Sequence, residues 1–146
     1  MTDYSNQTTL QIAGESDLAD LCALCDEVGL GKVPNQPSLD LAGIMALPTG
    51  RAWIARKDGV AVGCIAALFE GRRGWIYYFG VKAEARKTEL APQLLQTAEE
   101  YLKSLKAPKV LLMVRNSVPA LHKYYARLGY GRDDVTVMGK WLLPVE

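Results

Sequence analysis

Apolar side chains recur at helical spacing in three stretches of this chain. In residues 18–28, 91–105 and 118–128 they fall three or four positions apart, which places them on one face of a helix. Proline is tolerated in the first turn of a helix but not in its interior, so the second helix is expected to begin close before Pro92. The pattern therefore predicts three amphipathic helices.

A shorter helix is predicted to follow residue 38. Ser38 is a favourable N-terminal cap, and Leu41, Ile44 and Met45 recur at a spacing that would give the helix one apolar side. Residues 29–38 contain two prolines, so this stretch is expected to be a loop.

Between the helical stretches, the composition favours β-strands. Asp58-Gly59 is a strong signal for a two-residue hairpin, because both turn positions require a positive φ. Residues 109–114 are a nearly continuous apolar run, which is typical of a buried central strand. The strands predicted from these patterns are residues 9–13, 52–56, 60–69, 75–81, 109–114 and 135–142.

The order of these elements predicts an α/β (α+β) fold in which short connections make three consecutive strands antiparallel. A length of 146 residues fits one domain. We expect a polar N-terminal tail at residues 1–8 and a single domain over residues 9–146.

Composition excludes several classes of function. The chain is 49% hydrophobic, and 17 Lys and Arg balance 16 Asp and Glu to a net charge of +1. Disordered chains combine low hydrophobicity with high net charge, and nucleic-acid binders usually show a basic excess. A membrane-spanning helix needs about 20 apolar residues, and the sequence has no such window. We therefore expect a cytoplasmic protein without a nucleic-acid or membrane partner.

The three cysteines allow two interpretations. Cys22 and Cys25 form a C-x-x-C motif, and adding Cys64 and His122 would complete a zinc ligand set by count. Alternatively, Cys22 and Cys25 lie on the buried stripe of their helix. Because the third and fourth ligands are scattered along the sequence, we favour the second interpretation and expect no metal.

Three local features give the sequence a family resemblance. They are the hairpin Trp53–Ile65, the stretch from Phe79 through residues 86–91 to Leu94-Leu95, and the ending Tyr125–Tyr130. Together they resemble the GNAT superfamily of acyl-CoA-dependent N-acetyltransferases, from Leu10 to Leu142. Residues 70–74 before Tyr77-Tyr78 are similar to a small, single-domain bacterial branch. The resemblance implies a mixed, mostly antiparallel sheet flanked by helices, and transfer of an acetyl group from acetyl-CoA to an amine.

The family binds the cofactor pyrophosphate at a strand-to-helix turn with the pattern Gln/Arg-x-x-Gly-x-Gly/Ala. Free N–H groups at a helix start attract anions, and glycines let the backbone approach the phosphates. Glu89 stands at the first glycine position and adds bulk and negative charge, which makes the motif degenerate. An ordinary capped surface helix would also explain Lys87–Glu89. The pattern maps onto Arg86, Lys87, Thr88, Glu89, Leu90 and Ala91.

The resemblance also implies catalytic groups. Tyr125 matches a tyrosine that protonates the departing CoA thiolate, although Val118 stands where the family often has an asparagine. The backbone of Phe79, Gly80 and Val81 would bind the pantetheine arm and polarise the thioester carbonyl. Glu70 is the leading carboxylate for a general base, and a solvated turn residue is its simpler interpretation.

Three functions remain open at this point. The first is an N-acetyltransferase in which a small-molecule or peptide amine attacks acetyl-CoA directly. The second is a catalytically impaired protein of the same fold that serves as a binding or regulatory module, which Glu89 and Val118 favour. The third is a structural interaction protein that forms a homodimer through its long apolar strand edges. The acceptor is not specified by the sequence.

Overall fold

The computed structural model describes residues 8–144. Their contacts divide them into two compact units, one ending at Leu111 and one beginning at Leu112, and each is described by itself. The single domain over residues 9–146 stays a prediction. Of the predicted tail at residues 1–8, only Thr8 lies within the described residues, and it opens the first strand. None of the described helices is long and apolar enough to cross a membrane.

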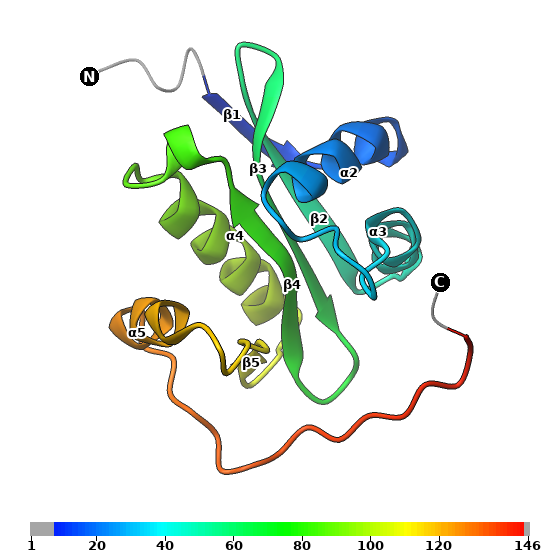
Figure 1. The fold of residues 1–146 in the computed structure, drawn as a ribbon, viewed down its shortest axis with the longest axis vertical. Coiled ribbons are helices and arrows are strands. Elements are labelled where there is room, and N and C mark those ends of the chain that lie inside the picture. Colours follow the sequence, from blue (N-terminus) through cyan, green and yellow to red (C-terminus); the bar gives the residue numbers. More distant parts are fainter. Residues whose placement is uncertain (1–7, 145–146) are drawn as a thin grey trace. The chain divides into compact units, whose positions relative to one another are not determined.

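The first unit is built on a five-stranded sheet in which the strands follow one another in chain order (Figure 1). Neighbouring strands are antiparallel, except that the last pairs parallel to the fourth. The sheet confirms the first four predicted strands. The strands are β1 (Thr8–Ile12), β2 (Gly50–Lys57), β3 (Val60–Phe69), β4 (Gly74–Val81) and β5 (Val110–Leu111).

The predicted Asp58-Gly59 turn joins β2 to β3. Asp58 has φ 51° and Gly59 has φ 82°, so both turn residues adopt the positive values that a two-residue hairpin of this twist requires. The turn sets the register at the start of this hairpin, with Lys57 opposite Val60. The structure confirms this prediction.

Helices cover both faces of the sheet in the first unit. The helices α2 (Leu18–Glu27) and α3 (Pro37–Ala46) lie on one face, and α4 (Leu90–Ser104) lies on the other (Figure 1). Glycine permits the close approach of α4, because a Cβ on Gly63 would stand 2.9 Å from Leu94 Cδ1. Two 3-10 turns precede α2 and α4, η1 (Glu15–Asp17) and η2 (Ala83–Ala85).

Apolar side chains fill the layer between the sheet and the α2–α3 pair. Burial of each large aliphatic side chain contributes about 1.5–3 kcal/mol, so this layer holds both helices against the strands. Cys25 belongs to this core, whereas Cys22 is half-buried, so only one of the two lies on the buried stripe that we predicted. The core includes Leu21, Leu24 and Cys25 of α2, Leu41 of α3, Ile54 of β2 and Cys64 of β3.

The second unit contains one helix, α5 (Pro119–Arg127), among its described residues. The predicted strand at 135–142 is wrong, since these residues form no strand and their side chains are exposed. Alternating apolar residues predict a strand only where a partner strand supplies a hydrogen-bonding ladder, and none pairs with this segment among the described residues.

Two further predictions are corrected in the first unit. Residues 109–114 do not form a buried central strand, because only Val110–Leu111 pair with β4 and both are half-buried. Ser38 is not the cap of its helix. Pro37 occupies a position in the first turn, where its missing N–H has no role, and the cap moves to Gln36.

Candidate functional site

A bulge interrupts the pairing of β4 with β3. Cys64 is opposite Gly80 and Ala66 is opposite Tyr77, so Tyr78 and Phe79 together face the single residue Ile65. Such a bulge bends the strand and re-aims the backbone groups that follow it. It lies within the stretch where the resemblance places thioester binding.

Tyr78 has an unusual backbone conformation at this bulge. Its φ is 50°, in the left-handed region that a residue with a Cβ occupies at a cost of about 1–2 kcal/mol. Its carbonyl oxygen accepts a hydrogen bond from Cys64 Sγ at 3.2 Å. A conformation of this kind persists only where the surroundings hold it in place.

The side chain of Tyr78 is anchored on a different element. Its phenol donates a hydrogen bond to Asp40 Oδ2 of α3 at 2.5 Å. Burial, with the bond to Asp40 as a second cause, raises the pKa of Tyr78, so the phenol keeps its proton at neutral pH. The bulge is therefore connected to α3 on one side and to β3 on the other.

Cys64 is buried beside a second thiol. Its contact with the Cys25 thiol, together with burial, holds the pKa of Cys64 well above its ordinary value. Cys64 therefore keeps its S–H and can donate to the Tyr78 carbonyl. Gly80, two residues after Tyr78 in β4, lies close to the segment at the end of α2. A Cβ on Gly80 would stand 2.9 Å from Leu30 and 3.1 Å from Val28.

The loop from β4 to α4 carries the predicted pyrophosphate motif. Arg86, Lys87, Thr88 and Glu89 are exposed, Leu90 is buried against the sheet and Ala91 is half-buried. The left-handed residue of the loop is Lys87, with φ 67°, while Glu89 has helical angles as the cap of α4. Glu89 therefore fits the backbone conformation, and its departure from the family pattern is one of size and charge.

The start of α4 offers few free donors. The Leu90 N–H already donates to Thr88 Oγ1 at 3.2 Å. Pro92 in the first turn has no N–H, and the Gln93 N–H is bonded to the Glu89 carbonyl at 3.0 Å. The loop keeps two cations, Arg86 and Lys87, as groups that can bind phosphate.

Glu70 occupies the turn between β3 and β4. Its carboxylate accepts the N–H groups of Arg73 and Arg72, and these bonds lower the pKa of Glu70. Five strand residues, about 16 Å of extended chain, separate the start of β4 from Phe79. The backbone of Glu70 therefore lies away from the bulge, although the Glu70 charge is a second cause, after burial, that raises the pKa of Tyr77.

Tyr125 lies on α5, in the second unit. It forms edge-to-face contacts with Tyr124 at 5.3 Å and with Tyr130 at 5.7 Å between ring centroids. Burial raises the pKa of Tyr125 to about 12, so the phenol is protonated at neutral pH but is a weaker acid than free tyrosine. The neighbouring Tyr124 hydroxyl is buried without a hydrogen-bond partner among the described residues.

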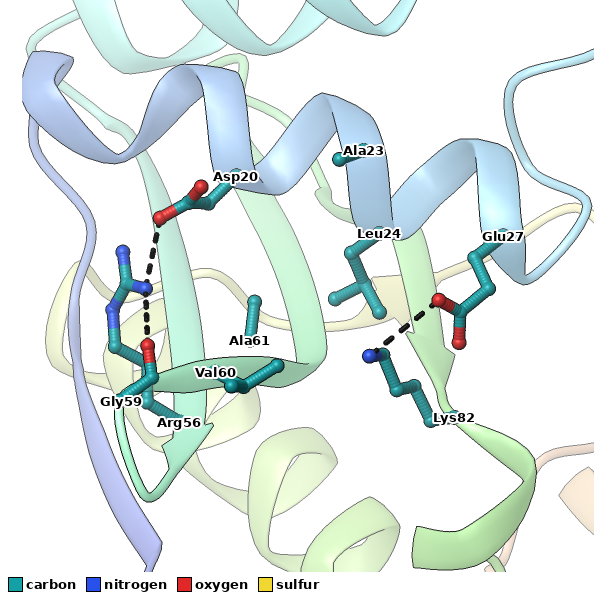
Figure 2. A pocket seen from close by; sticks show the side chains of 9 residues that line it. All are labelled: Asp20, Ala23, Leu24, Glu27, Arg56, Gly59, Val60, Ala61 and Lys82. Atoms are coloured by element: carbon teal, nitrogen blue, oxygen red, sulfur yellow. Dashed lines mark hydrogen bonds and ion pairs between the residues drawn. The ribbon is translucent and has the colours of Figure 1, made fainter.

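An open pocket of about 250 Å³ lies between α2 and the β2–β3 hairpin, and two ion pairs span it (Figure 2). Arg56 binds Asp20 at 2.9 Å, and Lys82 binds Glu27 at 3.4 Å. Because each charge faces an opposite charge, the pocket has no cation free for a phosphate. These pairs join residues more than 30 positions apart in the sequence, and no sequence motif predicts them.

The four residues of the hypothetical zinc set do not form a site. No group of three His, Cys, Asp or Glu side chains is placed to hold a metal in the part of the chain that the structure describes. His122 instead has a ring nitrogen 3.1 Å from the carbonyl oxygen of Arg115.

Sequence and structure comparisons agree on one family. The sequence profile of the acetyltransferase (GNAT) family matches residues 19–130, which is most of the chain. Three solved structures share the fold, at identities that carry no more than the fold. Aminoglycoside N-acetyltransferase AAC(6')-Iy, solved with CoA, is 15% identical, with a TM-score of 0.77 over 93% of this chain and 95% of that chain.

The other two structures are enzymes whose names give two different acceptors, an aminoglycoside and glucosamine 6-phosphate. Aminoglycoside 6'-N-acetyltransferase AAC(6')-IG from Acinetobacter haemolyticus is 16% identical, with a TM-score of 0.75 over 93% of this chain and 99% of that one. Glucosamine-6-phosphate N-acetyltransferase from Arabidopsis thaliana is 15% identical, with a TM-score of 0.70 over 92% and 98%. The bulged β4 and the loop that leads into α4 thus occur in a chain that belongs to the acetyltransferase (GNAT) family.

Proposed function

We propose that this protein is an N-acetyltransferase that uses acetyl-CoA as co-substrate and a small-molecule or peptide amine as acceptor. The observation that carries the proposal is that three features follow one another along the chain in one unit. They are the β4 bulge at Tyr78 and Phe79, the loop at 86–91, and the start of α4. The family membership supports it, and one related structure contains CoA.

The residues of the loop fit a pyrophosphate. Arg86 and Lys87 supply positive charge, the small side chain of Ala91 leaves room beside the backbone, and the helix dipole adds attraction for an anion. Glu89 opposes this with one negative charge, which its exposed position screens in part. The attraction by the two cations and the helix dipole outweighs the repulsion by Glu89, so we expect the pyrophosphate to bind, but more weakly than it would with glycine at position 89.

The proposed reaction is a direct transfer. The amine nitrogen forms a bond to the thioester carbonyl carbon, and the carbon–sulfur bond then breaks to release a thiolate. Backbone groups of Phe79, Gly80 and Val81 are proposed to stabilise the carbonyl oxygen as it gains negative charge. Tyr125 is proposed to supply the proton to the thiolate. The ammonium form of the amine loses one proton to a base or to water before attack and a second when the amide forms, and this second proton restores the phenol of Tyr125.

Glu70 is the leading carboxylate for a base, but its geometry favours the simpler interpretation of a turn residue. Its carboxylate caps the turn and its pKa is lowered, so it is a weak base. We expect Glu70→Gln to change kcat by less than about threefold. A loss of tenfold or more, with the pH profile of kcat shifted, would instead establish Glu70 as the base.

The alternative function is a binding or regulatory module with impaired transfer. The specific observation that favours it is the shortage of free donors at the start of α4, where Thr88 and Pro92 remove two N–H groups from anion binding. Glu89 acts in the same direction. In this case the protein would bind its amine ligand without consuming acetyl-CoA.

Thiol release separates the two functions. The protein is incubated with acetyl-CoA and a panel of amines that includes amino sugars, polyamines and peptide N-termini, and free CoA is measured with a thiol reagent. Amine-dependent release with a matching mass increase in one acceptor supports the transferase. An amine that binds by calorimetry while no CoA is released supports the module.

We further propose a cytoplasmic location and a homodimer. Large apolar side chains of the second unit are exposed, among them Met138 at 90% and Trp141 at 66%. Several large apolar side chains exposed along one segment are candidates for burial against a second copy of the chain. Light scattering during gel filtration is expected to give twice the chain mass, and a monomer at all concentrations would remove the homodimer.

A further inference from the structure

Two contacts from different elements hold Tyr78, and a third lies two residues further along β4. Cys64 of β3 donates to its carbonyl oxygen at 3.2 Å, and Asp40 of α3 accepts from its phenol at 2.5 Å. Leu30, which follows α2, lies over Gly80, where a Cβ would stand 2.9 Å from its Cδ1. Together these contacts oppose the return of a left-handed residue to an ordinary extended strand.

The conformation of Tyr78 determines the direction of the strand that follows it. With φ at 50°, Tyr78 turns the backbone so that Tyr77 and Tyr78, although adjacent, both pack against the same core cluster. In a regular strand, adjacent side chains point to opposite faces. If Tyr78 relaxed, the backbone groups of Phe79–Val81 would rotate with it.

We propose that Cys64 and Asp40 are positioning residues for acetyl transfer, because they hold Tyr78 in its left-handed conformation and so aim the backbone of Phe79–Val81 at the thioester carbonyl. The inference rests on the proposed function of this backbone. Neither residue touches the reacting atoms, and both act through Tyr78. Cys64 is suited to the role because it is 1% exposed and keeps its S–H.

The expected signature is a loss of kcat rather than of affinity. A backbone donor that stabilises the carbonyl oxygen contributes most when the oxygen carries charge, which happens in the transition state. A small rotation of Phe79–Val81 therefore weakens the transition state more than the ground state. A role in stability alone would lower the melting temperature and leave kcat of the folded protein unchanged.

The two buried cysteines provide a matched pair of variants. Cys64→Ala removes the bond to the Tyr78 carbonyl, whereas Cys25→Ala removes the thiol beside Cys64 and leaves the Cys64 donor to that carbonyl in place. We expect Cys64→Ala to lower kcat about fivefold to twentyfold with KM for acetyl-CoA within twofold. Cys25→Ala is expected to keep kcat within twofold. Cys64→Ser, which retains a donor, is expected to recover at least half of the wild-type kcat.

Tyr78→Phe tests the second anchor in the same assay. It keeps the ring and removes the phenol that bonds to Asp40, so we expect a kcat loss similar to that of Asp40→Ala and no further loss when both are combined. Additive losses would show that the two residues act separately and would overturn the role of Asp40.

The outcomes separate this inference from the proposed function. If the wild-type protein neither binds acetyl-CoA nor transfers an acetyl group, both proposals are overturned. If the wild-type protein is active and Cys64→Ala has the same kcat as Cys25→Ala, only the positioning role is overturned. Amide hydrogen exchange at Phe79 and Gly80 adds a readout besides activity, and faster exchange is expected in Cys64→Ala but not in Cys25→Ala.

Discussion

Glu89 illustrates how a departure from a family pattern can be separated into conformation and charge. The cap of α4 has helical angles at this residue, so glycine is not needed for the backbone. The negative charge remains as the unfavourable property. Since the side chain is exposed, its effect on a bound pyrophosphate must be sensitive to salt.

We therefore predict that Glu89→Gln strengthens acetyl-CoA binding about threefold to tenfold at low salt. Glu89→Gly is expected to do at least as well, because it also removes the bulk. Glu100→Gln is the control, since this exposed carboxylate lies on the same helix about 16 Å further along. Calorimetry at two salt concentrations measures the change, and equal affinities for wild type and Glu89→Gln would show that the charge has no role.

Adjacent tyrosines on α5 allow the proposed acid to be tested against a close neighbour. Tyr125→Phe is expected to lower kcat at least tenfold, because general acid catalysis typically contributes about a hundredfold or more. Tyr124→Phe is expected to keep kcat and to leave stability unchanged or slightly higher, since it removes a hydroxyl without a described partner. Intact turnover in Tyr125→Phe would end the assignment of Tyr125.

At the scale of elements, η1 is tied to the sheet through Asp17. One carboxylate oxygen accepts the Gly14 N–H at 2.8 Å, and the other pairs with Arg56 of β2 at 2.8 Å. The Gly14 bond, with Arg56 as the next cause, lowers the pKa of Asp17 below its ordinary value of 3.8. A lowered pKa contributes stability above pH 3.8, and this stability is lost as the pH falls through the folded-state pKa.

Asp17→Asn is accordingly predicted to destabilise the protein by about 0.2–1 kcal/mol at pH 7, because the ion pair with Arg56 is lost while the amide oxygen can still accept the Gly14 N–H. The difference from wild type should begin to shrink below about pH 3.8 and should vanish below the lowered pKa of the folded state, where the wild-type carboxyl is also neutral. Urea unfolding at pH 7 and at the lowest pH where the fold persists measures both values. A difference that does not depend on pH would contradict the account of Asp17.

Elements with a local cause were predictable from the sequence. The Asp58-Gly59 turn and α4 each depend on residues within a few positions, so pattern and propensity sufficed. The strands expected at 109–114 and 135–142 were predicted wrongly, because a strand requires a partner strand and apolar composition does not show whether one is present. The cap of α3 was misplaced by two residues because Pro37 and Ser38 are both favourable at a helix start.

At the scale of the whole molecule, only part of the candidate site could be read from the sequence. The loop at 86–91 was found because its residues are contiguous. The contacts that hold the bulge were missed, since they join Tyr78 to Asp40 and to Cys64, 38 and 14 positions away. Gly80 within an aromatic strand was the one local sign of irregularity in β4.

The central claim is that this fold still binds acetyl-CoA in spite of Glu89. Binding to the folded state alone stabilises it by about 2.7 kcal/mol at a ligand concentration of 100 times Kd. For a chain of this length, that corresponds to a rise in melting temperature of about 5–10 °C. A rise of this size with acetyl-CoA is the predicted result, and no shift at millimolar acetyl-CoA would contradict the account.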